Sequence, residues 1–442
     1  RARIKTASGE IKTKTYEITN IDKINLTVTA KQSSVTITEG TSNALSNYFT
    51  ITANGKYGIS STVYIDTSNN NEVITNTNTL APGTHVIKCT ATKETGATAN
   101  ATITIVVEES GPKVDENGLA TTPTTIKPDK NSNLQIVIPA GFAPAILQTG
   151  TTQSLPGQDG SVKNKMPVSQ WNNITADDIN KGIVVVDSDE NEFVWIPITD
   201  ASKFARMAWT TKHGYAANGW WQHNLTTPHP LSEEISPTIG WWEDKTTDEY
   251  KNMVTSVTQN KGFYVARYEA SANSDSSKAQ SKRDATTWTD ISQTDAITKS
   301  ANYNSTLHLH LMYGIEWDSI LNWLNGNAII SKDGQNTAIG LADLQTNSCS
   351  WGNYWNSTGN AATNKGYKQT TGTSEYWKAN NIYDLAGNVD EWTQEKYSTG
   401  TIRASRGGDY VHNGDDGPAA DRNNNGASST NRSVGFRASF YL

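Results

Sequence analysis

Hydrophobic and polar residues alternate along most of the first 108 residues of the chain. Each alternating run is bounded by Gly, Asn or Pro, and the clearest runs are residues 24–29, 34–38, 62–65 and 102–107. A period of two residues is typical of strands that bury one face and are joined by short turns. We therefore expect an all-β unit over residues 22–108. Residues 1–21, which alternate on both sides of Ser8 and Gly9, are expected to be the closing hairpin of a preceding β unit.

The pattern changes twice after this unit. Residues 109–133 have no hydrophobic period and are rich in Pro, Gly, Thr and Lys, which is typical of a linker. All 14 Trp residues fall between Trp171 and Trp392, and a shift in composition of this kind marks a change of domain. We therefore place a second domain over residues 134–442.

Short apolar runs and one amphipathic helix are predicted in this second domain. Strands are expected at residues 134–139 and at residues 182–187 and 192–197, the last two forming a hairpin at the edge of a sheet. A helix is expected over residues 313–324, because helical spacing places on one face Trp317, Ile320, Leu321 and Leu324. Helices are few and loops rich in Asn, Gly and Ser are many, so the second domain is assigned to the α+β class.

The charge and composition exclude some partners. The chain of 442 residues has a net charge of −7 and a sequence pI of about 5.6, which argues against nucleic acid or an anionic membrane as the main partner. Only 18% of residues are charged, whereas 58 are Thr and 43 are Asn, a composition typical of extracellular β-rich proteins. No apolar run reaches the roughly 18 residues that a membrane span requires. Since the chain opens on Arg1, we expect a fragment of a longer secreted protein.

Cys89 and Cys349 are the two cysteines, and they lie 260 residues apart in the sequence. Neither a disulfide framework nor a cysteine zinc site can be built from such a pair. We expect both side chains to be small buried hydrophobic groups.

Three ordered motifs near the C-terminus carry the most information. Residues 386–388 read as a turn that leads Glu391 and Trp392 into a strand. The Gly407–Gly408 pair after Arg406 permits a backbone bend or a close approach. Residues 435–440 read as a terminal strand with Phe436 and Ala438 on one face and Arg437 on the other.

Together these motifs resemble the formylglycine-generating-enzyme-like (sulfatase-modifying factor) branch of the C-type lectin fold, over residues 134–442. The predicted helix at residues 313–324 lies where that family has its Glu-Trp helix. The resemblance implies a set of scaffold residues, namely Gly387, Asn388, Glu391, Trp392, Arg406, Gly407, Gly408, Gly435, Phe436 and Arg437. Position 390 is Asp where the family usually has Trp, a departure that we expect in a solvent-facing position.

Residues 82–107 resemble the last hairpin of a bacterial immunoglobulin-like domain, and the resemblance extends over residues 22–108. It implies an immunoglobulin-like sandwich ahead of the lectin-type domain. The second core cysteine of antibody domains is missing, so no disulfide between the two sheets is implied.

The enzyme of the formylglycine family carries its chemistry on a cysteine pair between the Arg-Gly-Gly turn and the closing strand. Thiolates are the nucleophiles and metal ligands that such chemistry requires. No Cys occurs between Gly408 and Gly435, and Cys349 is single and upstream. We therefore reject the oxidase activity and predict a protein that is not an enzyme and uses neither a cofactor nor a metal.

Residues 397–442, which we call the restricted segment, lack five residue types. Lys, Glu, Gln, Met and Trp are absent, although roughly eight would be expected in 46 residues from their frequency in the whole chain. These five types are the ones that cannot arise when the first two bases of an AAC or AAT codon are randomised. A loop depleted of long side chains by chance is the alternative interpretation.

The restricted segment resembles the variable region of proteins diversified by bacterial and phage diversity-generating retroelements, which lies between the same turn and strand on a C-type lectin scaffold. The resemblance places the variable region at about residues 406–437. The resemblance implies that variable side chains form one solvent-exposed ligand-binding face, and we place on it Asp409, Tyr410, Val411, His412, Asn413, Asp415, Asp416, Asp421, Ser428, Ser429, Arg432 and Ser433. Tyr410 and His412 are the expected anchors, and Arg432 could pair with a carboxylate. The four aspartates favour a cationic or amide-rich ligand.

Other groups of residues permit alternative sites. His308 and His310 could offer two metal ligands on one strand face, but no acidic third ligand is evident and a surface strand is expected. The acidic turn at residues 187–192 lacks the Gly-centred spacing of a calcium loop, so a solvated hairpin is expected. The pairs Trp220–Trp221 and Trp241–Trp242 could stack on sugars, but are expected to anchor loops or the core. The calcium-dependent sugar motifs of true lectins are absent, so calcium-mediated sugar binding is not implied.

Three functions follow from these patterns. The first is a receptor-binding adhesion protein displayed on a bacterial surface or a phage particle, with an immunoglobulin-like stalk and a hypervariable lectin-type head that binds a protein or glycan on another cell. The second is a non-catalytic module of the formylglycine-enzyme type that binds carbohydrate or protein and is not diversified. The third is a hydrolase that uses Asp415, Asp416 and Asp421, although acids on a surface loop have no reason for a raised pKa.

Overall fold

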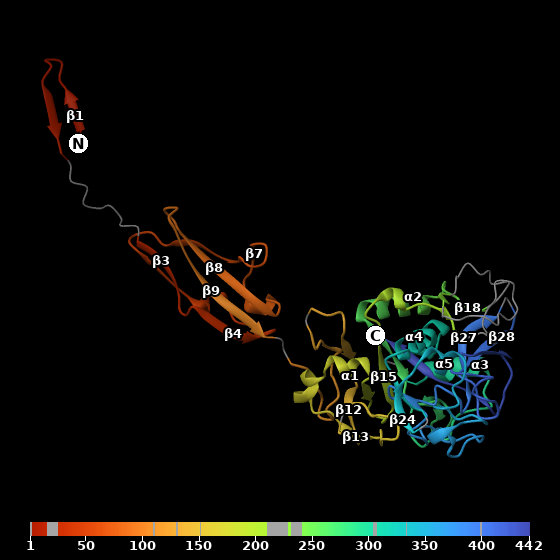
Figure 1. Ribbon diagram of the computed structural model, residues 1–442. Coiled ribbons are helices and arrows are strands. Elements are labelled where there is room, and N and C mark those ends of the chain that lie inside the picture. The colour runs from red at the N-terminus through yellow and green to blue at the C-terminus, as the bar shows by residue number, and fades with distance from the viewer. Residues whose placement is uncertain are drawn as a thin grey trace. The chain divides into compact units, whose positions relative to one another are not determined.

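The computed structural model describes residues 2–15, 25–108, 111–129, 131–150, 152–209, 229–230, 241–303, 307–332, 334–397 and 400–442. The chain divides into two compact units, residues 1–111 and residues 112–442 (Figure 1). Each unit is described by itself.

The first unit is built from strands, as the alternation predicts. Its strands are β1 (Ala2–Lys5), β2 (Ile11–Lys14), β3 (Asn25–Ala30), β4 (Ser34–Thr38), β5 (Phe49–Asn54), β6 (Ile59–Asp66), β7 (Glu72–Val73), β8 (Gly83–Lys93) and β9 (Thr98–Glu108). β3 pairs with β5, and a second sheet has the order β4-β9-β8-β6-β7. Alternate residues of β8 and β9, Cys89 among them, are buried in one core, which also holds Leu45 and Phe49. The immunoglobulin-like identity stays a prediction.

The second unit contains a seven-stranded antiparallel sheet. Its order is β13 (Val162–Lys165), β12 (Ala143–Leu147), β14 (Val184–Val186), β15 (Glu192–Pro197), β19 (Gly262–Ala266), β31 (Ala438–Tyr441) and β22 (His308–Leu311). The hairpin of β14 and β15 forms as predicted, but the expectation that it lies at a sheet edge is wrong. Val184 and Val194 enter one core and Val185 and Phe193 another, so both faces of the hairpin are covered.

A second, five-stranded sheet carries the C-terminal motifs. It contains β18 (Trp241–Trp242), β27 (Asp390–Tyr397), β28 (Ile402–Arg406), β29 (Arg422–Gly426) and β30 (Val434–Phe436). β30 runs parallel to β27, and the other pairs are antiparallel. The turn at Gly387 and Asn388 leads into β27 as predicted, because both residues have positive φ.

The helices are α1 (Ala176–Asn180), α2 (Asp248–Asn260), α3 (Gln293–Ala301), α4 (Gly314–Leu324) and α5 (Leu341–Gln345). α4 confirms the predicted helix, and Trp317, Ile320, Leu321 and Leu324 all lie in one hydrophobic core. Two-stranded ladders complete the unit: β10 (Thr124–Ile126) with β11 (Ile136–Ile138), β16 (Met207–Ala208) with β17 (His229–Pro230), β20 (Ser271–Ala272) with β21 (Ala279–Gln280), β23 (Ile329–Lys332) with β24 (Gln335–Ala338), and β25 (Lys378–Ala379) with β26 (Ile382–Tyr383). Across the described ranges, no helix is long and apolar enough to cross a membrane.

The structure differs from the predicted linker at residues 109–133. From Pro112 onward the chain belongs to the second unit, where β10 pairs with β11. Leu119 and Ile126 are buried in the core that also contains Trp171. The segment has no hydrophobic period because it covers an existing core with single apolar residues and supplies only a three-residue strand.

Candidate functional site

The 407–421 loop, between β28 and β29, is held at both ends by one buried ionic network. Arg406 is the last residue of β28 and Arg422 the first of β29. Their guanidinium groups donate to the two oxygens of Asp318 on α4, at 3.0 and 2.6 Å. Both also donate to Glu395 on β27, at 3.2 and 3.0 Å. All four side chains are fully buried, so the bonds are not screened by water.

Glu395 is the centre of this network. Burial alone would raise the pKa of its carboxyl, but the guanidinium groups of Arg422, Arg206 and Arg406 outweigh burial and hold the pKa far below its usual range. Arg206 Nη2 lies 2.5 Å from Glu395 Oε1. A carboxylate with three cationic partners remains ionised, so the loop ends stay fixed across the physiological pH range.

Fixed residues upstream hold the backbone of the 407–421 loop between these ends. The hydrogen bonds of this kind include Tyr354 Oη to Gly407 O (2.7 Å), Trp355 N to His412 O (2.9 Å), Ser348 N to Gly414 O (2.9 Å), Trp317 Nε1 to Ala419 O (3.0 Å), and Ala420 N to Leu344 O (3.0 Å). Bonds to the main chain do not depend on loop side chains. Exposed loop positions can therefore change without moving the backbone.

Gly408 is required where the loop closes on itself. Its φ is +73°, and a Cβ at this position would overlap the carbonyl oxygen of Gly417. Glycine alone accepts this combination of left-handed backbone and close approach. The predicted role of the glycine pair is confirmed at this residue.

The closing strand is held by a second buried ion pair. Arg437 donates to both oxygens of Glu391 and to the carbonyls of Ala266 and Tyr383, at distances of 2.6 to 3.2 Å. Phe436 and Ala438 lie in the hydrophobic core on the opposite side, as predicted. The turn residue Asn388 donates its amide to Glu269, at 2.5 Å.

The twelve predicted ligand-binding residues differ in exposure. Six are exposed, namely Val411, His412, Asp416, Ser428, Ser429 and Arg432, and Tyr410, Asn413 and Asp415 are partly exposed. The expectation that all twelve are exposed is wrong for Asp409, Asp421 and Ser433, which are buried. The exposed residues lie on two loops, 407–421 and 427–433, and whether they bind a ligand stays a prediction.

The buried residues build the loops that carry the exposed ones. Asp409 Oδ1 accepts the backbone N–H groups of Val411 and His412 at 3.0 and 3.1 Å, and the His412 ring nitrogen Nδ1 lies 2.7 Å away. This Asx-type turn orients the exposed imidazole. Ser433 accepts the N–H of Asp390 through its carbonyl, which joins the 427–433 loop to the start of β27.

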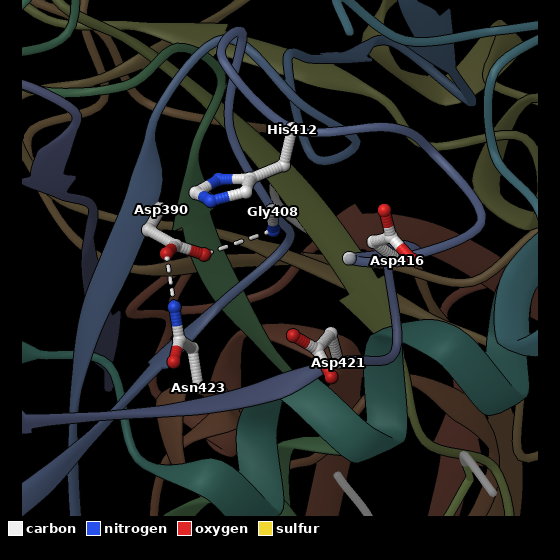
Figure 2. A pocket seen from close by; sticks show the side chains of 7 residues that line it. Asp390, Gly408, His412, Asp416, Asp421 and Asn423 are labelled. Atoms are coloured by element: carbon white, nitrogen blue, oxygen red, sulfur yellow. Dashed lines mark hydrogen bonds between the residues drawn. The ribbon is translucent and has the colours of Figure 1, made fainter. Parts of the chain in front are cut away.

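A cavity of about 160 Å³ opens at the base of the 407–421 loop, and it is lined by Asp390, Gly408, His412, Asp416, Gly417, Asp421 and Asn423 (Figure 2). Asp390 was expected to face solvent, but it is buried. Its two oxygens accept the Gly408 N–H at 3.0 Å and the Asn423 amide at 3.1 Å. Burial and the carboxylates of Asp409 and Asp421 raise the pKa of Asp390 well above its usual range.

Asp390, Gly417 and Asn423 are cavity residues that the sequence reasoning did not place at the site. The departure from the family's usual Trp at position 390 was the one available signal. A carboxylate in place of an indole leaves space beside the loop, and the structure contains a cavity there.

The alternative metal sites are not assembled. The expected surface strand holds for His308, which is exposed on the edge strand β22, but not for His310, which is buried and lies 3.0 Å from Glu316 and 3.1 Å from Ser439. At the acidic turn, Asp187 accepts the N–H groups of Asp189 and Asn191. In the part of the chain that the structure describes, no three His, Cys, Asp or Glu side chains could hold a metal ion.

The remaining candidates from the sequence are the two Trp pairs and the two cysteines. Trp242 on β18 is partly buried, and the Lys396 ammonium lies 4.8 Å from its ring centroid. Trp220 and Trp221 lie outside the described residues. Cys89 and Cys349 are both buried, as expected, and form no disulfide.

Comparison with known proteins gives a family match and several distant structural likenesses. The sulfatase-modifying factor enzyme 1-like domain matches residues 197–439. PvdO from Pseudomonas aeruginosa is 13% identical, with 58% of this chain and 96% of that chain covered and a TM-score of 0.34. Treponema denticola variable protein 1 is 15% identical, with 73% and 100% covered and a TM-score of 0.23. The fibronectin(III)-like modules of Clostridium thermocellum CbhA are 18% identical, with 24% and 60% covered and a TM-score of 0.16.

No curated protein sequence matches the chain. The family match covers more than half of the chain and includes the three C-terminal motifs, with the two loops between them. The chain belongs to the sulfatase-modifying factor enzyme 1-like domain family, which has a C-type lectin-like fold.

Proposed function

We propose that the second unit is a ligand-binding head whose restricted segment is diversified by a retroelement. Ligand is bound by exposed side chains of the 407–421 and 427–433 loops on a fixed lectin-type scaffold. The first unit is an immunoglobulin-like stalk, and the protein is displayed on a bacterial cell surface or a phage particle, where it acts in adhesion to another cell.

The observation that carries this proposal is the residue composition of the restricted segment. Its 46 residues use only types that randomised AAC or AAT codons can encode. The loops in this segment are supported by residues outside it, such as Asp318 and Glu395. A scaffold of this kind keeps its shape while exposed side chains change, and diversification by codon replacement requires that property.

We infer binding rather than catalysis for this head. Cys349 is buried and its sulfur lies 3.7 Å from the Thr358 hydroxyl, and the chain has no second cysteine within the family-matched residues. Two of the carboxylates that a hydrolase would use take part in the structure of the loop. Asp415 accepts the Asn356 amide at 3.0 Å, and Asp421 is buried beneath the loop.

A comparison of DNA sequences tests diversification against the undiversified alternative. The last 120 or so bases of this gene are aligned with any near-copy beside it. We expect differences concentrated at adenines of the copy and a reverse-transcriptase gene nearby. Differences spread evenly over all four bases, or no near-copy at all, would leave an undiversified binding module of the same family.

A further inference from the structure

Large hydrophobic side chains are exposed around the 407–421 loop. Among the described residues of the second unit, five large hydrophobic side chains are exposed, and two of them are the aromatic residues Trp355 and Tyr367, at 62% and 70%. A third, Val411, belongs to the loop itself, at 39%. Single exposed apolar residues are common, but a Trp and a Tyr beside a candidate binding loop mark an interaction surface.

Trp355 is joined directly to the loop. Its backbone N–H donates to the His412 carbonyl at 2.9 Å. The next residue, Asn356, bonds the Gly414 N–H at 2.8 Å and the Asp415 carboxylate at 3.0 Å. The backbone that carries the indole is therefore held beside the exposed side chains at 411 and 412.

The residue before Tyr367 packs against the same indole. A Cβ on Gly366 would come within 3.0 Å of the Trp355 ring, so the backbone next to Tyr367 packs against that ring. Asn353 donates its amide to the Tyr367 carbonyl at 2.8 Å and to Asn388 at 3.1 Å. The named bonds of Trp355 and Tyr367 themselves are made by main-chain groups, which every loop sequence supplies.

Trp355 also supplies a residue type that the restricted segment lacks. Trp cannot be encoded by randomised AAC or AAT codons, yet Trp and Tyr are among the residues that contribute most to protein interfaces. Trp355 and Tyr367 precede Lys396 and lie outside the restricted segment. They would therefore be present in every variant of the loop.

The shape and charge of the site favour a protein as the occupant. The cavity of about 160 Å³ accepts one side chain, whereas sites for whole small molecules measure roughly 300–1,000 Å³. Besides the buried Asp390, whose pKa is raised, two of its lining residues are carboxylic acids, Asp416 and Asp421, and none is Lys or Arg. Charge complementarity favours a basic side chain in the cavity.

We propose that Trp355 and Tyr367 are constant contacts of a composite binding face, beside which the loop varies, and that its occupant is a folded protein inserting a basic side chain into the cavity. This rests on the proposed function, because it assumes that the 407–421 loop binds ligand. The fixed aromatic residues supply affinity common to all variants, and the loop supplies specificity.

A display experiment tests this on the full chain. Positions 410–413 are randomised with codons of the NNC and NNT type, Asp415 and Asp416 are retained, and clones are selected against hen lysozyme, a basic protein. Trp355→Ala, Tyr367→Ala and Leu155→Ala are then introduced into several clones with different loops. Leu155 is the matched control, since it is 39% exposed in the same unit. Trp355→Phe, which keeps a ring, and thermal unfolding show whether a loss comes from misfolding.

We expect each aromatic-to-Ala change to weaken lysozyme binding about tenfold or more in most clones, with Leu155→Ala neutral. Binders that tolerate both changes would overturn the composite face while leaving the proposed function intact. A library that yields no loop-dependent binders would overturn the proposed function itself. Asp416→Asn, or succinylation of the lysozyme amines, should also weaken binding about tenfold, and equal affinity in both cases would overturn the basic occupant.

Discussion

Arg406 and Arg422 bind opposite oxygens of the same carboxylate, Asp318, at 3.0 and 2.6 Å. They are the residues on either side of the 407–421 loop and pair across β28 and β29, so one buried anion on α4 ties both loop ends to the helix. Ion pairs of this kind contribute little net stability compared with apolar packing, but removing one partner is costly. The arrangement fixes geometry, which is what a loop of changing sequence requires.

Asp318→Asn is expected to destabilise the second unit by about 3–5 kcal/mol, because Arg406 and Arg422 would lose a shared buried anion. Guanidinium unfolding followed by Trp fluorescence measures this, since all 14 Trp lie in the second unit. Asp177→Asn breaks the exposed pair with Lys181 and should cost less than about 1 kcal/mol. Equal losses in the two variants would contradict the role of the network.

Substitutions of Asp409 and His412 are expected to affect different properties, stability in the first case and ligand binding in the second. Asp409→Ala removes the acceptor of two backbone N–H groups and should lower stability by about 1 kcal/mol. His412→Ala changes an exposed side chain and should alter stability by less than about 0.5 kcal/mol while weakening binding to a confirmed ligand. Thermal unfolding and a binding titration on both variants check this. If Asp409→Ala weakened binding and His412→Ala lowered stability instead, Asp409 and not His412 would lie at the ligand.

Gly408→Ala is expected to cost clearly more than Gly326→Ala. Both residues have positive φ, +73° and +77°, so both substitutions carry the same backbone strain of about 1 kcal/mol. A Cβ at 408 would also overlap the Gly417 carbonyl, whereas a Cβ at 326 meets nothing within 4 Å. The difference in melting temperature between the two variants measures only the cost of the close approach between a Cβ at 408 and the Gly417 carbonyl. Equal melting temperatures would show that the loop relaxes freely.

Asp390 is expected to make the second unit less stable as pH rises. The pKa of Asp390 is raised in the folded state. Its contribution to the free energy of unfolding is therefore fully present below the unfolded-state pKa of about 3.9, and it is lost as pH rises through the folded-state pKa. Asp390→Asn removes this contribution. The stability of wild type minus that of the variant should therefore fall between pH 4 and neutral pH. A difference that is constant with pH would contradict the raised pKa.

The boundary of the second unit is expected to lie at residue 112. A chain of residues 112–442 should melt higher than one of residues 134–442, because the shorter chain loses β10 and the buried Leu119 and Ile126. Each of these side chains contributes about 1.5–3 kcal/mol when buried. Melting curves of the two chains decide the point, and equal melting temperatures would support the linker that the sequence pattern predicts.

Much of the scaffold could be predicted from local pattern. Helical spacing identified α4, short apolar runs identified β14 and β15, and alternation identified strands of the first unit. These elements follow from short-range patterns, which the sequence displays directly. The position of β14 and β15 inside the sheet could not be predicted, because it depends on which distant strands pair with them.

The candidate site could likewise be predicted only in part, because some of its features are local in the sequence and others depend on distant contacts. The order of the three motifs, the residue types missing after Lys396 and the lack of a Cys between Gly408 and Gly435 are properties of the sequence alone. Exposure is not such a property. Asp409 and Asp416 are the same residue type in the same loop, yet one caps a turn inside the fold and the other faces solvent at the cavity. Tertiary structure alone decided this difference, because burial depends on contacts with residues far away in sequence, as when Arg422 meets Asp318 across 104 positions.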